Sequence, residues 1–123
     1  MYELLYRTSV TDGTGLPAPT SSLKFKGKSG RYSAVEIFLK SIATATGIDW
    51  TFWFRTTALA SDTDGWIYDS DTDLVLTATK ALSASGTGGV VVLPDPPGEE
   101  FTLQLGAPAG GGTVYCEVRG RVK

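Results

Sequence analysis

The sequence predicts an all-β fold, namely an antiparallel β-sandwich of jelly-roll type with eight or nine short strands. Apolar and polar residues alternate with a period of two in several segments, as half-buried strands require. The segments between them are rich in Gly, Pro, Asp and Ser, which favour turns. With 123 residues, the chain is long enough for one compact domain, residues 1–123, and too short for two ordinary ones.

The alternation places the expected strands along the chain. Val35, Ile37 and Leu39 alternate with Glu36, Phe38 and Lys40, and Leu23 and Phe25 alternate with Lys24 and Lys26. In the C-terminal run, one face holds Val114, Cys116, Val118 and Val122, and the other holds Tyr115, Glu117, Arg119, Arg121 and Lys123. In chain order, we expect strands near residues 2–10, 23–26, 35–40, 50–59, 65–69, 73–82, 90–93, 101–105 and 114–123.

One segment also fits a helix. Ser33 and Glu36 match a capping box, and Gly47 is a possible helix end. The β-branched residues in this segment, Val35 and Ile37 among them, favour a strand, and a helix is the alternative. The glycine runs at 86–89 and 110–112 are expected to be hairpin connections.

Composition excludes several classes of function. The net charge is −2 and the pI is near 5, so neither nucleic acid nor a membrane is an expected partner. The chain has no histidine, which excludes Ser-His-Asp and Cys-His hydrolysis. The single cysteine, Cys116, lies in an alternating run and is expected to be buried and inert. We therefore expect no enzyme, no catalytic residue and no cofactor, and the start of the chain shows no export signal.

The acidic stretch at 61–73, S-D-T-D-G-W-I-Y-D-S-D-T-D, is the one place where potentially reactive side chains crowd together. A calcium loop that starts at Asp69 would place Leu74 and Lys80 where glycine and glutamate are needed. Glycoside hydrolysis needs a carboxyl with a raised pKa, which exposed turns do not provide. We expect two acidic turns flanking a short strand, and no metal.

Basic and aromatic side chains on polar strand faces are the candidate interface. An aromatic residue among polar neighbours marks a contact surface, and a row of cations suits an acidic partner protein. The candidates are Lys24, Lys26, Phe38, Trp53, Tyr115, Arg119 and Arg121.

The order of segments from Gly30 onward resembles that of small β-sandwich virion proteins of tailed bacteriophages, which decorate or cement the head. The segments are G-R-Y-S-A-V-E-I-F-L-K-S-I-A-T-A-T-G, D-W-T-F-W-F-R, the acidic hairpin, L-V-L-T-A-T-K-A-L-S-A-S-G-T, the Val-rich strand, the Pro-rich loop, E-E-F-T-L-Q-L and G-T-V-Y-C-E-V-R-G. The resemblance implies a structural protein without cofactor or catalytic residues. It also implies a homo-oligomer, commonly a trimer, that is made in the host cytoplasm and binds the major capsid protein or another virion protein of the phage head.

A carbohydrate-binding β-sandwich module is the alternative function. Trp53, Trp66 or Tyr68 would then stack on a sugar ring, and Asp64 and Asp69 would bind its hydroxyl groups. Two coplanar exposed rings flanked by aspartates would favour this alternative, whereas rings buried between subunits would favour the virion protein.

Overall fold

The computed structural model describes residues 1–11, 15–19, 23–56, 65–69, 76–82 and 88–123. Within these ranges the chain forms eight β-strands and one 3-10 turn. They are β1 (Tyr2–Thr11), β2 (Gly27–Lys28), η1 (Ser29–Arg31), β3 (Tyr32–Ala43), β4 (Gly47–Arg55), β5 (Thr77–Ala81), β6 (Gly88–Pro94), β7 (Glu100–Leu105) and β8 (Thr113–Val122). The described residues hold no helix long and apolar enough to cross a bilayer.

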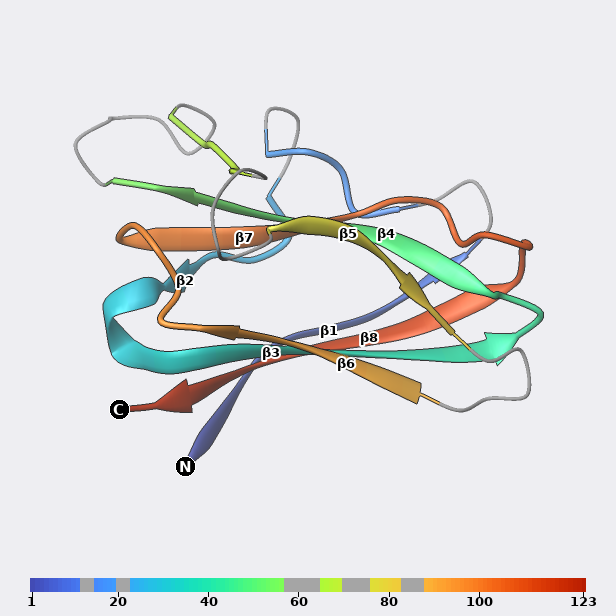
Figure 1. Cartoon of the computed structure of the whole chain (residues 1–123), viewed down its shortest axis with the longest axis horizontal. Helices are drawn as coiled ribbons and strands as arrows, with labels where there is room; N and C mark the ends of the chain where they lie inside the picture. Colours follow the sequence, from blue (N-terminus) through green and yellow to red (C-terminus); the bar gives the residue numbers. More distant parts are fainter. Residues whose placement is uncertain (12–14, 20–22, 57–64, 70–75, 83–87) are drawn as a thin grey trace.

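Two four-stranded antiparallel sheets pack face to face, which confirms the predicted sandwich (Figure 1). The first sheet has the order β1-β8-β3-β6, and the second sheet has the order β2-β7-β4-β5. The pairs β1 with β8, β2 with β7, β3 with β6 and β4 with β5 are those of one long antiparallel hairpin rolled into two layers. This is the jelly-roll arrangement.

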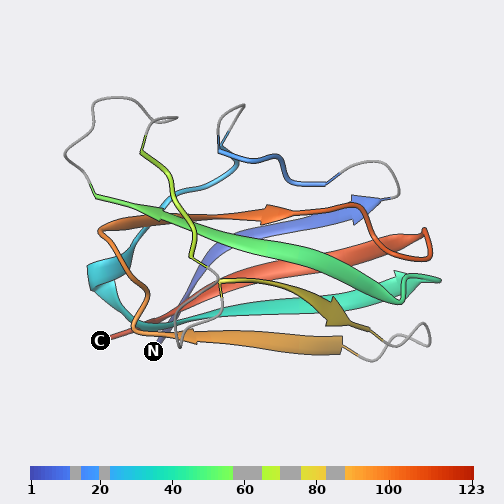
Figure 2. The ribbon, with the colours of Figure 1, turned by 45° about the horizontal axis from the view of Figure 1, so that its top comes forward.

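Rolling up the hairpin makes the chain pass from one sheet to the other between most consecutive strands, as the tilted view shows (Figure 2). The prediction of a hairpin at 110–112 is therefore wrong, because β7 belongs to the second sheet and β8 to the first. Gly110, Gly111 and Gly112 all have positive φ, which lets this short connection cross the layers. The prediction of a hairpin at 86–89 is wrong for the same reason, because β5 belongs to the second sheet and β6 to the first. Gly88 and Gly89 begin β6, and residues 86–87 lie outside the described ranges.

The segment from Ser33 onward, which also fits a helix in sequence, is a strand. β3 is twelve residues long and pairs with both β8 and β6, so the helix alternative is wrong. Its inward side chains Val35, Ile37 and Leu39 are almost completely buried, as the alternation predicted. The energy of this two-sided pairing outweighs the local capping signal at Ser33.

Two expected strands are not formed as predicted. Residues 23–26 are not part of a strand, and only the two residues that follow them, Gly27 and Lys28, pair as β2. The Phe25 ring instead stacks on Tyr6 at 5.0 Å between ring centres and packs edge-on against Phe101. At 65–69, a single bridge joins Ile67 to Phe54. Gly65 has φ 75°, so the extended conformation is interrupted just before this bridge.

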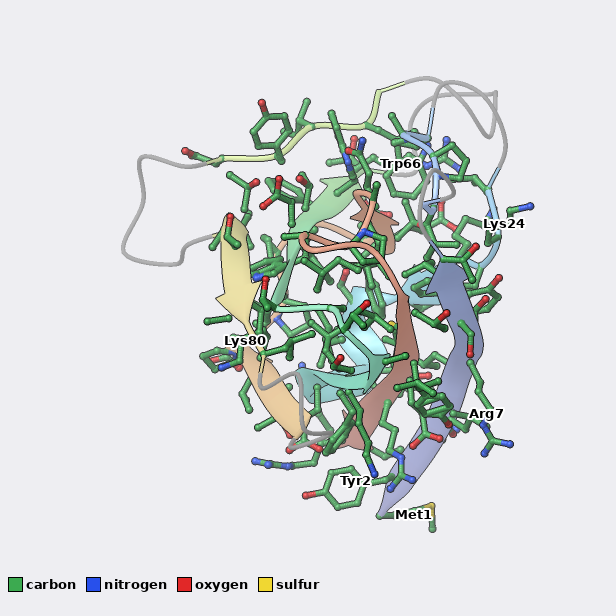
Figure 3. All side chains as sticks on the ribbon, turned by 90° about the vertical axis from the view of Figure 1, so that its right-hand side faces the viewer. Met1, Tyr2, Arg7, Lys24, Trp66 and Lys80 are labelled. Carbon is green, nitrogen blue, oxygen red and sulfur yellow. The ribbon has the colours of Figure 1, made fainter. Side chains whose placement is uncertain are left out.

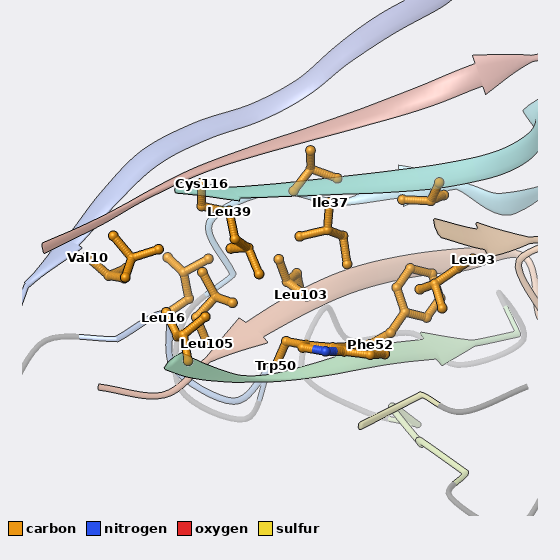
Figure 4. Close-up of a cluster of buried hydrophobic side chains, with 14 of the residues drawn as sticks. Val10, Leu16, Ile37, Leu39, Trp50, Phe52, Leu93, Leu103, Leu105 and Cys116 are labelled. Atoms are coloured by element: carbon orange, nitrogen blue, oxygen red, sulfur yellow. The ribbon is translucent and has the colours of Figure 1, made fainter. Parts of the chain in front are cut away.

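The core fills the space between the inner faces of the two sheets (Figure 4). Phe52 of β4 and Phe101 of β7 stack at 5.1 Å between ring centroids, and both are almost completely buried. Trp50 is buried beside them, whereas Phe54 is half-buried. The core also contains Val10, Leu16, Ile37, Leu39, Ile48, Leu76, Leu93, Leu103, Leu105, Val114, Cys116 and Val118.

Candidate functional site

The predicted interface residues are divided among three places. Phe38, Tyr115, Arg119 and Arg121 lie together on the outer face of the first sheet. Trp53 lies on the outer face of the second sheet, so the structure does not bring it to the others. Lys24 and Lys26 precede β2, and the Lys26 ammonium is 3.5 Å from the Glu100 carboxylate. Figure 3 shows Tyr2 and Arg7 on one side of the molecule, and Lys24 and Trp66 on the opposite side.

The strand register explains which side chains meet on the first-sheet face. We use this name for the outward residues Tyr2, Leu4, Arg7, Glu36, Phe38, Lys40, Val90, Val92, Tyr115, Glu117, Arg119 and Arg121. Arg119 lies opposite Leu4 on one side and Glu36 on the other, and Glu36 lies opposite Val92. In the next row, Glu117 lies between Arg7 and Phe38. Cross-strand neighbours at this spacing contact each other directly.

Glu117 is the centre of a hydrogen-bonded cluster on this face. Tyr115 donates its hydroxyl to the Glu117 carboxylate at 2.7 Å, Arg7 donates to it at 3.3 Å, and Arg119 also donates to it. The Tyr115 hydrogen bond, with Arg119 and Arg7, holds the pKa of Glu117 below its usual range. The same bond raises the pKa of Tyr115. Glu117 is buried by these neighbours although it points outward, so the cluster fixes several long side chains in place.

Two further arginine contacts extend the cluster along the sheet. Arg121 donates to Glu36 at 2.9 Å, and its guanidinium lies 5.6 Å from the centre of the Tyr2 ring. The Arg119 guanidinium lies 5.3 Å from the centre of the Phe38 ring. Each arginine therefore pairs with a carboxylate and also covers an aromatic face.

Apolar side chains are exposed beside these ion pairs. Tyr2 is 50% exposed, Leu4 51%, Val90 42% and Val92 45%. A shallow pocket of about 410 Å³ lies at one end, lined by Phe38, Leu39, Lys40, Gly88, Gly89, Val90 and Tyr115. Sequence reasoning did not select Tyr2, Leu4, Val90 or Val92. Alternation assigns a face within a strand, but only the register shows that these four belong to the same face as Phe38.

The outer face of the second sheet carries different chemistry. A groove of about 420 Å³ is lined by Asp49, Thr51, Thr77, Ala78, Thr79, Gln104 and Gly106. Thr79 donates to the Asp49 carboxylate, and the Thr51 and Thr77 hydroxyls are 3.1 Å apart. We call these lining residues the second-sheet groove. None of them was selected from the sequence, because isolated threonines on a strand carry no distinctive pattern.

The aromatic residues of the carbohydrate alternative do not form a flat ledge. The Trp53 and Tyr68 rings are 4.7 Å apart but stand at 78° to each other, so they are not coplanar. Trp66 is buried, with the Arg55 guanidinium 4.6 Å from its ring centre. Asp69 is half-buried, and Asp64 lies outside the described residues.

Arg55 explains why Trp66 turns inward. Its side chain is 4% exposed and lies 3.0 Å from the Glu100 carboxylate, so this ion pair is almost completely desolvated. The Trp66 ring covers the guanidinium and excludes water from it. Trp66 therefore belongs to the structural support of β4 and β7.

Most of the aspartates that were considered as calcium ligands lie outside the described ranges. Asp62, Asp64, Asp71 and Asp73 of the acidic stretch are among these residues. The part of the chain that the structure describes contains no group of three acidic or cysteine side chains placed to share an ion. Cys116 is buried in the core, and burial raises the pKa of its thiol to about 12. It is therefore an unreactive thiol, as predicted.

Comparison with known proteins gives no family. No protein-family model matches the chain, and no curated protein matches its sequence.

Proposed function

We propose that the chain is a non-enzymatic virion structural protein of a tailed bacteriophage, a decoration or cement protein that binds the head at capsomer junctions and stabilises it. The proposal starts from the segment order described above. The jelly roll is consistent with it, because viral capsid proteins are one of the groups that use this fold. The observation that carries the docking role is the first-sheet face.

The composition of the first-sheet face suits a protein partner. Exposed Tyr2, Leu4, Val90 and Val92 supply apolar area, and aromatic residues and arginines are the side chains enriched at protein interfaces. Because the arginines are already held by Glu36 and Glu117, little side-chain freedom is lost on binding. The face is built for contact with a rigid surface.

Charge indicates the kind of partner. On this face, Arg7, Lys40, Arg119 and Arg121 outnumber the carboxylates of Glu36 and Glu117, although the chain as a whole has a net charge of −2. A partner surface with acidic groups around apolar residues is complementary to it. We propose that this partner is the major capsid protein, bound by a homo-oligomer, with a trimer favoured. Weak contacts of each subunit would then add up through multivalency.

The test is binding to purified heads that lack the protein, from the phage that encodes the chain. We expect the protein to cosediment with these heads and to raise the temperature at which they release DNA. Val92→Glu should weaken binding at least tenfold, because it places an acid in the apolar part of the face. Ala81→Glu is the matched control, because Ala81 is an exposed residue of β5 on the other sheet. Analytical ultracentrifugation measures the oligomeric state.

Two results would overturn the proposal. One is a failure of the wild-type protein to bind or stabilise these heads. The other is equal binding of Val92→Glu and Ala81→Glu, which would remove the first-sheet face from the docking role.

A further inference from the structure

We propose that the second-sheet groove is a binding site for a neutral saccharide. This site is on the sheet opposite the first-sheet face, so it does not depend on the head-binding role. It retains Trp53 from the carbohydrate alternative but replaces Trp66 and the acidic stretch with residues of β4, β5 and β7.

The strand register builds the groove from three neighbouring strands. Asp49 of β4 lies opposite Thr79 of β5, and Thr51 of β4 lies between Thr77 of β5 and Gln104 of β7. Asp49 and Thr51 alternate with the buried Ile48 and Trp50, and Gln104 precedes the buried Leu105, so these side chains point outward. Thr77 and Thr79 lie on the same face because they are paired with Thr51 and Asp49. The result is a compact set of polar groups on a stiff surface. Its volume of about 420 Å³ lies within the range of small-ligand sites.

Hydrogen bonds within the groove fix its side chains and leave capacity for a ligand. Thr79 donates to one oxygen of Asp49, and a carboxylate has about four acceptor sites. Trp53 Nε1 donates to Gln104 Oε1 at 2.9 Å. The Gln104 amide nitrogen carries two protons and donates to no acceptor among the described residues, so it can donate to a ligand. The Thr79 hydroxyl, whose proton goes to Asp49, can still accept, and the Thr51–Thr77 pair uses one of its two protons, which leaves the other able to donate. A ligand with several adjacent hydroxyl groups matches this mixture.

Trp53 supplies the apolar element that such a ligand requires. Its ring is half-buried on the same outer face and hydrogen-bonded to Gln104, and the centres of the Trp53 and Tyr68 rings are 4.7 Å apart in an edge-to-face arrangement. The hydrogen bond to Gln104 and the contact with Tyr68 hold the indole in one orientation. A sugar ring has C–H groups as well as hydroxyls, and an indole with a polar edge accommodates both.

The charge of the groove excludes other ligand classes. Among the described residues, no cationic side chain lines it, and the Asp49 carboxylate repels anions such as phosphate or acidic sugars. One carboxylate with hydroxyl groups is too few anionic ligands for a dedicated calcium site. Lipids and other apolar ligands would cover the groove without using the remaining hydrogen-bonding capacity of Asp49, Gln104 and the threonines. A neutral polyhydroxyl ligand satisfies each of these constraints.

The experiment is a glycan array with labelled protein, followed by calorimetry with the best neutral oligosaccharide. We expect selective binding of neutral glycans and at least a tenfold loss of affinity in Asp49→Ala and in Gln104→Ala. In ¹⁵N spectra, the oligosaccharide should shift the amide signals of Thr51, Thr77 and Thr79. The control is Val92→Glu, which changes the first-sheet face and should bind the glycan like the wild type.

Folding is checked for every variant by its thermal unfolding midpoint. Thr77→Val and Thr79→Val, which keep the β-branched shape, provide a second test if Asp49→Ala unfolds. The proposal is overturned if no neutral glycan binds, if only anionic glycans bind, or if the groove variants keep wild-type affinity. Preferential binding of an extended peptide along β5, displaced by none of the glycans, would also overturn it.

Discussion

Glu3 shows how one half-buried carboxylate can hold two distant parts of the chain together. Arg31 Nε donates to its two oxygens at 2.9 and 3.0 Å, and the Tyr32 hydroxyl donates to it at 2.6 Å. These bonds connect β1 to the turn η1, which precedes β3. The hydrogen bonds from Arg31 and then Tyr32 lower the pKa of Glu3 from 4.5 to about 2. Burial, with the bond to Glu3, raises the pKa of Tyr32 to about 12.

The lowered pKa of Glu3 predicts an acid-sensitive part of the stability. Because the unfolded chain binds a proton at Glu3 more readily than the folded one, the contribution is complete above pH 4.5 and is lost as pH falls to about 2. Glu3→Gln should therefore lower the free energy of unfolding at pH 6, and the difference from wild type should shrink towards pH 2. Urea titrations at several pH values measure this. Asp95→Asn, at an exposed position, is the control for loss of one charge, and a constant difference in Glu3→Gln would contradict the prediction.

Among the elements, the short connection between β7 and β8 has the tightest steric requirement. Gly112 has φ 77°, and a Cβ atom there would lie 1.9 Å from the Ala43 carbonyl oxygen. The neighbouring Gly110 also has positive φ and approaches Thr44. The connection therefore needs glycine both for its conformation and for its close approach to the end of β3.

Gly112→Ala should destabilise the fold by at least ~2 kcal/mol, because the left-handed conformation and the overlap with Ala43 each cost energy. Gly30→Ala is the matched control. A Cβ atom at Gly30 meets nothing within 4 Å, and its φ is not in the left-handed region, so the stability should stay within ~0.5 kcal/mol or rise slightly. Chemical denaturation measures both. Similar stabilities of the two variants would show that the connection relaxes around the new methyl group.

A strand of this fold can be predicted from the sequence when it is paired on both sides and one of its faces is buried. β3, β7 and β8 are predicted well, because each is paired on both sides and its alternation directly reflects the core. The residues at 23–26 and 65–69 alternate too, but Phe25 and Trp66 make specific contacts that interrupt pairing. Such contacts depend on residues far away in the chain, which local patterns do not contain.

The candidate sites follow the same rule. Tyr115 and Arg119 are outward residues of β8, whose alternation is clear, so their common face was predictable, whereas only the register places Phe38 of β3 beside them. The second-sheet groove needs the register of β4 against β5 and β7, which aligns Asp49 with Thr79 and Thr51 with Gln104. A threonine alone gives no indication of this alignment. The second-sheet groove therefore depends on strand pairing, whereas the outward face of a single strand can be predicted from its alternation.

At the scale of the whole molecule, the jelly roll separates two surfaces of different character on one rigid body. The first-sheet face is cationic and apolar, and the second-sheet groove is polar with one carboxylate. The buried core lies between the inner faces of the two sheets and joins them. The two proposed partners therefore have separate sites, and Val92→Glu and Asp49→Ala should each impair one kind of binding without the other.

The first and last strands, β1 and β8, are neighbours in the first sheet. β1 pairs with β8 along nearly its whole length, and Val122 N–H donates to the Met1 carbonyl at 2.9 Å, so the two ends of the sequence are side by side. Bringing such distant segments together costs loop-closure entropy before any contact is gained. Folding should therefore be slow for a domain of this size.

Joining Lys123 to Met1 by a short Gly-Ser linker should speed up folding, because β8 and β1 then form a local hairpin. One permutant is opened between Thr44 and Ala45 and a second between Asp95 and Pro96. Thr44 and Asp95 are exposed and have positive φ, so opening the chain there removes local strain. Stopped-flow fluorescence of the three tryptophans measures the rates. We expect both permutants to fold severalfold faster than the wild type, while their unfolding rates change little. Native-like permutants that fold no faster than the wild type would show that β1–β8 pairing forms after the rate-limiting step.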